Sequence, residues 1–257
     1  EISIFFEEDD YVENYEKIAS SQLSALEVGG ENPFMNELHW EALEESTLKL
    51  VLKYLKSKDE LVLDVGVGTG RFLSKLPSNI QKFGIDISIS MLHLAKSKRI
   101  NVCMGSGEDL PYSDNVFDLI VSTDVLEHVL DLNAVLKEII RVLKPGGIFI
   151  LRVPYKEDLK SYVNNKDFKY VHLRRFDEYG LQLMLNRVFK LTVLEFNTCG
   201  GNLNRYVLKK YLPNIFIIVF LLCIHSLKFV NKKLWWFFAS YFYPDDEINM
   251  VCQKPVS

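Results

Sequence analysis

The sequence lacks several features that would place a protein in a narrow class. Basic residues are not in excess, because 30 Lys and Arg face 34 Asp and Glu for a net charge of −4, so nucleic acid is not an expected partner. No signal peptide is visible, since the apolar stretch at Ile2–Phe6 is short and acidic residues follow it. Cysteines are few and form no CxxC pair; they are Cys103, Cys199, Cys223 and Cys252. We therefore expect a cytoplasmic protein with reduced thiols and no zinc knuckle.

What the sequence does contain is ample apolar material in a regular alternation. Of its 257 residues 48% are hydrophobic, and from residue 61 short β-branched runs alternate with amphipathic stretches. This alternation predicts βαβ units and a mainly parallel sheet covered on both faces. The expected strands are Leu61–Val65, Lys82–Ile85, Asn101–Met104, Phe117–Ser122, Ile148–Val153, Leu191–Phe196 and Ile248–Cys252. The expected helices are Glu41–Leu55, Arg71–Leu76, Ser88–Lys98, Leu132–Leu143 and Asp177–Val188.

A glycine-rich loop follows the first of these strands. The segment LVLDVGVGTGRF places Asp64 before three glycines at alternate positions, Gly66, Gly68 and Gly70. Glycine permits positive φ and a close backbone approach to a ligand. The GxGxG spacing departs from the GxGxxG of dinucleotide folds, and the Asp64 carboxylate would repel a pyrophosphate. The loop instead suits a ligand with a cationic amino group, such as the methionine part of S-adenosylmethionine (SAM).

A second acidic residue ends the next expected strand. Asp86 follows Asp64 by 22 residues, which is one strand-helix-strand step. A carboxylate at this position can accept hydrogen bonds from both hydroxyls of a ribose. The two acidic residues and the glycine loop together predict a nucleoside site.

With these motifs the chain resembles the class I SAM-dependent methyltransferases, and within them the branch of the ubiquinone/menaquinone C-methyltransferases and related small-molecule enzymes. The segments Gly105–Val129 and Leu136–Leu151, with a Pro-Gly-Gly turn, are similar to later blocks of that family. The resemblance covers Leu61–Phe196 and implies a Rossmann-like α/β fold with a seven-stranded, mostly parallel sheet whose last strand is antiparallel. It implies SAM as cofactor and S-adenosylhomocysteine as product.

The resemblance also implies cofactor contacts by position. Asp64 would hold the methionine amino group, and Asp86 the ribose. The family often has Asp where Ser106 stands, which leaves a contact to the adenine amino group open. The implied cofactor-binding residues are Asp64, Gly66, Gly68, Gly70, Asp86, Ile87, Met91, Ser106, Gly107 and Thr123.

Two histidines are the candidate catalytic residues. His128 comes just after the fourth expected strand, where substrate-facing residues gather in open α/β folds. His172 begins a His-x-x-x-Phe element that the resemblance places beside the active site. An imidazole can take a proton near neutral pH. Each histidine could instead serve only to stabilise its loop. A run like Asp124-x-x-Glu127-His128 holds a divalent cation in some quinone O-methyltransferases, but relatives without metal also carry it, so we assign no metal here.

Several charged residues near these motifs have simpler explanations. We expect Asp118 to stabilise the start of its strand and Asp177 to cap a helix. Arg174 and Arg175 could bind an acidic substrate group, although exposed arginines usually only solvate a surface.

Residues 212–243 differ from the rest in composition. Residues 215–224 read IFIIVFLLCI, and lysines and a dense aromatic group follow. The run is shorter than the roughly 20 residues of a bilayer-spanning helix. Aromatic residues beside lysines suit the headgroup zone, which predicts peripheral contact with the cytoplasmic membrane face. A lid over the site, or a homodimer surface, would favour the same residues.

The expected organisation has four parts. Residues 1–60 form a helical N-terminal cap, 61–196 the SAM-binding core, 197–247 an apolar insertion, and 248–257 the final strand. The expected function is methyl transfer from SAM to a small or lipid-linked acceptor, quinone-like or a glycan precursor. A SAM-binding scaffold or regulator without turnover is the alternative.

Overall fold

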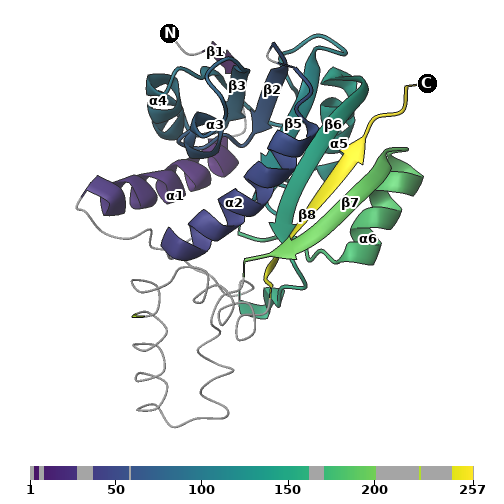
Figure 1. Cartoon of the computed structure of the whole chain (residues 1–257). Coiled ribbons are helices and arrows are strands. Elements are labelled where there is room, and N and C mark those ends of the chain that lie inside the picture. Colours follow the sequence, from purple (N-terminus) through teal and green to yellow (C-terminus); the bar gives the residue numbers. More distant parts are fainter. Residues whose placement is uncertain are drawn as a thin grey trace.

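One eight-stranded sheet organises the described part of the chain (Figure 1). The structure is a computed structural model that describes residues 3–5, 9–27, 37–57, 59–161, 171–200, 226 and 245–256. The strand order is β1-β4-β3-β2-β5-β6-β8-β7. The strands are β1 (Ser3–Phe5), β2 (Leu61–Val65), β3 (Gln81–Asp86), β4 (Asn101–Gly105), β5 (Phe117–Thr123), β6 (Leu143–Pro154), β7 (Thr192–Cys199) and β8 (Glu247–Gln253).

Helices connect the strands and cover the sheet. They are α1 (Asp9–Glu27), α2 (Glu37–Tyr54), α3 (Arg71–Ser74), α4 (Ile89–Ser97), α5 (Leu132–Val142) and α6 (Glu178–Leu183), which continues as a π-helical turn over Met184–Val188, and a short 3-10 turn covers Leu159–Ser161. The expected helix at Asp177–Val188 is therefore an α-helix that widens into a π-turn. The other expected helices and strands agree with the structure to within a few residues, apart from β6, which begins five residues earlier than expected.

Helices cover both faces of the sheet, and neighbouring residues of the central strands point to opposite faces, so side chains on both faces are buried. On one face Leu63 packs in a core with the buried side of α5 and α6. On the other face Val62 packs in a second core with α2, α3 and α4. These two cores explain why the central strands read as continuous apolar runs rather than as alternating ones.

The last strand confirms the expected mixed topology. β8 lies between β6 and β7 and runs antiparallel to both, whereas the other pairings of the sheet are parallel. Strands β2–β8 thus form the expected seven-stranded Rossmann-like sheet. The short strand β1 adds an eighth, pairing parallel to β4 at the sheet edge.

The N-terminal helix α1 was not predicted as a separate element. It contacts α4 and lies across the carboxyl ends of the parallel strands, at the lower edge of the sheet in Figure 1. Tyr11, Tyr15 and Ile18 from this helix line the cavity described below. α1 therefore forms one wall of the candidate site.

The expected insertion lies mostly outside the described residues. β7 extends to Cys199 and β8 begins at Glu247, so residues 201–225 and 227–244 fall outside them. The apolar run at 215–224 and the aromatic group after it are among these. No helix in the described part of the chain is long and apolar enough to cross a membrane.

Candidate functional site

A cavity of about 610 Å³ opens at the carboxyl ends of the parallel strands. Its wall includes the residues at the ends of β2, β3, β4 and β6, together with α1 and the start of β8. The strand order reverses between β2 and β5, and in open α/β sheets such a reversal leaves a crevice that binds ligands. The topology therefore creates the cavity at the position where this fold places its ligand.

Glycine is required at the three loop positions for different structural reasons. All three have positive φ, at 82°, 51° and 71° for Gly66, Gly68 and Gly70. A Cβ on Gly66 would lie 2.1 Å from a methyl group of Val125, and one on Gly70 would lie 3.0 Å from the Cα of Ala95. A Cβ on Gly68 would meet no atom within 4 Å, and Gly68 lines the cavity. Gly66 and Gly70 therefore permit tight packing, whereas Gly68 leaves room for a ligand.

Asp86 joins the glycine loop to the start of α4. Its Oδ2 accepts the backbone N–H of Gly68 at 2.8 Å, and its Oδ1 accepts that of Ser88 at 2.9 Å. Burial raises the pKa of the carboxyl group, and the two backbone hydrogen bonds oppose this shift. Asp86 lines the cavity, so the same carboxylate that holds the loop is presented to a ligand.

Asp64 lies deeper than the sequence pattern suggests. It is 2% exposed and is not among the lining residues, although its neighbours Val65 and Gly66 are. Its Oδ1 has no hydrogen-bond partner among the described residues. Burial, and the nearby charge of Asp86, raise its pKa well above the usual range. A buried carboxylate with one oxygen unpartnered would be stabilised by a cationic group at the glycine loop, so the site fits the amino group of SAM.

The four expected adenine-side residues are brought together, unlike one residue that was expected on the methionine side. Ile87, Met91, Ser106 and Gly107 all line the cavity. The Ser106 hydroxyl accepts the backbone N–H of Glu108 at 3.1 Å, which holds it within its own loop. Thr123 ends β5 but is not among the lining residues.

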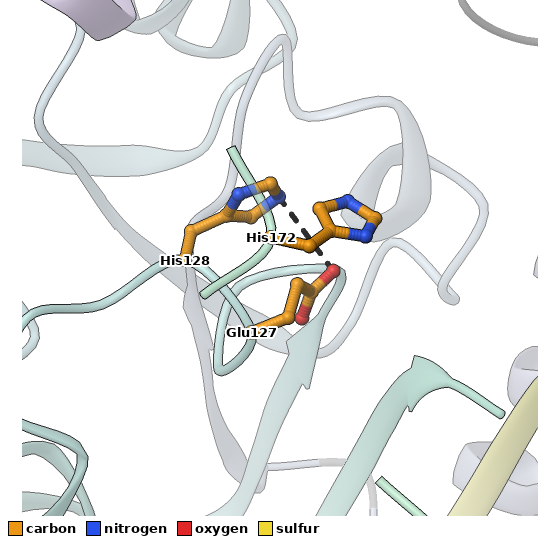
Figure 2. A group of neighbouring side chains, drawn as sticks. All are labelled: Glu127, His128 and His172. Carbon is orange, nitrogen blue, oxygen red and sulfur yellow. Dashed lines mark ion pairs between the residues drawn. The ribbon is translucent and has the colours of Figure 1, made fainter. Parts of the chain in front are cut away.

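Two histidines and a glutamate converge at the other end of the cavity. Figure 2 shows the rings of His128 and His172 close to the carboxylate of Glu127, and we call these three residues the histidine cluster. The two rings meet edge to face at 4.7 Å between centroids. The Nδ1 of His128 lies 3.2 Å from the carbonyl oxygen of Val171, and the Nδ1 of His172 contacts the carboxylate of Glu157. Both histidines predicted to be catalytic therefore face the same space.

Burial controls the ionisation of this cluster. It lowers the pKa of His128 to about 4, with a smaller contribution from His172, so the His128 ring is neutral near pH 7. Burial likewise raises the pKa of Glu127, which is 0% exposed. Neither carboxylate oxygen of Glu127 has a hydrogen-bond partner in the described part of the chain.

Sequence reasoning missed an ion pair between a buried arginine and Asp124 beside the cluster. Arg152 of β6, 2% exposed, donates from its Nε to Asp124 at 3.2 Å and also pairs with the second oxygen of that carboxylate. Its remaining nitrogen donates to the hydroxyl of Thr47 on α2 at 3.2 Å. An arginine within the otherwise apolar run IFILRV was the signal that could have revealed the pair. Both carboxylate oxygens of Asp124 therefore bind Arg152.

The tyrosines of α1 were also missed. Tyr15 packs edge to face on His128 at 5.6 Å between ring centroids, and the Tyr11 hydroxyl donates to the carbonyl oxygen of His128 at 3.3 Å. Burial raises the pKa of both hydroxyls. No motif marks these residues, because only the fold of α1 brings them to the cavity.

Other charged residues near the motifs have structural roles. Asp118 accepts the backbone N–H of Leu61 at 3.0 Å, and Asp177 caps α6 by accepting the N–H of Gly180 at 2.8 Å. Arg174 donates to the carbonyl oxygens of Val129 and Leu130 and is not among the lining residues. Its guanidinium therefore supports the loop after β5 rather than the cavity.

Comparison with known proteins gives matches over the same region. Residues 63–151 match the family described as methyltransferase domain. An uncharacterised protein of Methanocaldococcus jannaschii is 39% identical over 132 residues, which are 51% of this chain and 57% of that protein. The ubiquinone/menaquinone biosynthesis C-methyltransferase UbiE of Geotalea daltonii is 33% identical over 131 residues, 46% of this chain and 56% of that protein. The chain spans about half the length of the curated relatives it matches.

A solved structure agrees in fold. The protein bound to the Haloferax volcanii Trm112 methyltransferase activator superposes with a TM-score of 0.65 at 20% identity, covering 93% of this chain and 98% of that one. At this identity the likeness shows the shared fold alone. Residues 63–151, which contain the glycine loop and Asp86, are thus similar to the methyltransferase domains of class I S-adenosylmethionine-dependent enzymes, whose cofactor is SAM.

Proposed function

We propose that the protein transfers a methyl group from SAM to a small-molecule acceptor bound beside the histidine cluster. The observation that supports this most is the continuity of the cavity. One wall holds the glycine loop and Asp86, and the same cavity reaches His128 and His172. A donor and an acceptor would therefore share one cavity, as direct transfer between them requires.

The protein's own contribution is mainly to bind and orient. When bound, SAM supplies a methyl group on a sulfonium, which is already a potent donor. Asp86 would hold the ribose, and Ile87 and Met91 would pack against the adenine. The α1 tyrosines would close the cavity and exclude water. Holding donor and acceptor in line is the largest rate effect available to such a site.

His128 and His172 are the proposed catalytic residues. Both line the cavity, and Glu157 orients the ring of His172 through its Nδ1. From these positions the two rings would contact the acceptor and assist the loss of its proton, which methylation of a hydroxyl, or of a carbon activated by one, requires.

The class of acceptor is indicated by the relatives and by the composition of the chain. The UbiE relatives favour a quinone-like acceptor, and a glycan precursor on a lipid carrier is the other lipid-linked candidate. The apolar composition of residues 212–243 favours peripheral contact with the cytoplasmic face of a membrane, where either acceptor would be found. A homodimer surface would use the same residues.

The test is transfer of labelled methyl groups from SAM into an extract of cells, separated into organic and aqueous phases. Label in the organic phase would support a lipid-linked acceptor, and label in the aqueous phase a soluble one. Label in neither phase, with SAM binding confirmed by calorimetry, would contradict the proposed activity. The SAM-binding scaffold would then be the better description.

A further inference from the structure

We propose that Glu127, His128 and His172 bind one divalent transition-metal ion at the acceptor end of the cavity. Each residue offers one ligand atom, and these atoms all lie within 4.8 Å of one another. The Nε2 of His128 and the Oε1 of Glu127 are 3.6 Å apart. Two ligands of a tetrahedral ion, each about 2.1 Å from it, lie about 3.4 Å apart. Two of the three ligand atoms are thus already spaced for a shared ion, and a small movement of His172 would bring in the third.

The carboxylate of Glu127 points to a missing cationic partner. Its side chain is 0% exposed, and neither oxygen has a hydrogen-bond partner among the described residues. A buried carboxylate in this state is costly unless it is paired with a charge or binds a metal. The buried cation nearby, Arg152, already holds both oxygens of Asp124. A metal ion between Glu127 and the two rings would supply the charge that the protein does not.

The hydrogen bonds of the two histidines match those of metal ligands. A ligating histidine usually donates its other ring N–H to a backbone carbonyl or a carboxylate, which fixes the ring and its tautomer. His128 has the carbonyl oxygen of Val171 at its Nδ1, and His172 has the carboxylate of Glu157. Because the Nδ1 of His128 contacts Val171, its Nε2 is the nitrogen that can bind the metal, and this atom faces Glu127.

The ligand set also indicates the kind of ion. Asp124, the first residue of the acidic run considered from sequence, is excluded by its ion pair with Arg152, and His172 takes its place from a distant segment. Two imidazoles and one carboxylate favour Zn²⁺, Co²⁺, Fe²⁺ or Mn²⁺ over Mg²⁺ and Ca²⁺, which prefer oxygen ligands. Three protein ligands leave coordination positions open. Resting on the proposed function, we assign these positions to an oxygen atom of the acceptor. The two histidines would then assist the loss of the acceptor's proton through the ion, rather than by accepting the proton themselves.

The test is titration of the EDTA-treated full chain with Co²⁺, followed by visible absorption and calorimetry. The wild-type chain should bind one Co²⁺ and develop the absorption of a low-coordinate cobalt site. Glu127→Gln and His172→Gln should weaken binding at least tenfold, and Glu157→Gln, which changes only the partner of a ligand, about tenfold to 100-fold. The matched control is His93→Gln, which removes an exposed histidine of α4 and should leave Co²⁺ binding unchanged.

SAM binding serves as the folding control for every variant, because the ligands lie outside the glycine loop. Absence of Co²⁺ binding by the wild-type chain, or equal affinity in wild type and Glu127→Gln, would overturn the metal site. Co²⁺ binding without any methyl transfer would leave the site standing and contradict the proposed function. Methyl transfer that resists EDTA treatment would instead overturn the assignment of the open positions to the acceptor.

Discussion

Substitution of Asp86 separates cofactor binding from folding. In Asp86→Asn one carboxylate oxygen becomes an NH₂ group, which cannot accept a hydrogen bond from a backbone N–H or from a ribose hydroxyl. A hydrogen bond to a charged group contributes about 1.5–3 kcal/mol. Loss of one such bond to the ribose, taken as about 2 kcal/mol, corresponds to about 30-fold weaker SAM binding. Isothermal titration calorimetry would measure it directly.

The stability of the SAM-free Asp86→Asn variant should change much less than its affinity for SAM. Burial raises the pKa of Asp86, so the folded chain is penalised for holding this carboxylate ionised, and the neutral amide removes that penalty. This gain offsets the weakened hydrogen bonds to Gly68 and Ser88. We expect the melting temperature of the SAM-free variant to lie within about 3 °C of wild type.

Asp118→Asn is the matched control for this variant. Asp118 also accepts a backbone N–H at a strand start and pairs with Lys144 at 2.6 Å, but it is not among the cavity-lining residues. The control should keep wild-type SAM affinity even if it loses some stability. SAM affinity within threefold of wild type for both variants would refute the role given to Asp86.

Three further perturbations follow from the structure. Gly70→Ala should lower the free energy of unfolding by about 3 kcal/mol in urea titration, because its φ is 71° and the new Cβ would lie 3.0 Å from the Cα of Ala95; a loss under 1 kcal/mol would contradict this packing. Arg152→Met should cost about 1.5–3 kcal/mol by removing the charged donor from Asp124, whose side chain is 29% exposed, and a neutral effect would show that the pair does not contribute to stability. Burial raises the pKa of Asp64. Acidification therefore protonates Asp64 and removes the carboxylate that suits the SAM cation. The SAM-free protein, in contrast, gains stability as the pH falls through that raised pKa. The rise in melting temperature caused by SAM should therefore be larger at pH 8 than at pH 5.5, and a pH-independent rise would exclude this role for Asp64.

The sequence was sufficient for strands β2–β8 and for placing most of the residues at the glycine-loop end of the cavity. Both depend on local patterns: continuous apolar runs form strands that are buried on both faces, and glycines at fixed offsets after a strand permit a tight turn. Asp86 was predictable because it lies one strand-helix-strand step after Asp64. Such steps bring residues to the same sheet edge whatever the remaining sequence.

The acceptor end depends on contacts between distant segments, which no local pattern encodes. Tyr15 reaches His128 across more than 100 residues because α1 folds over the strand ends, and His172 joins Glu127 from beyond β6. The pairing of Arg152 with Asp124 likewise requires the register of β5 with β6. The sequence run places Asp124 with Glu127 and His128, but it could not reveal that Asp124 pairs with Arg152 and is therefore not one of the proposed metal ligands.

The most direct test of the account is a crystal structure of the full chain with S-adenosylhomocysteine. We predict the ribose hydroxyls on Asp86, the adenine between Met91 and Gly107, the amino group near Asp64, and the sulfur facing the side of the cavity that holds His128 and His172. An occupied cavity with the sulfur directed away from both histidines would contradict the assignment of the acceptor end. Failure of the ligand to enter this cavity would contradict the cofactor site itself.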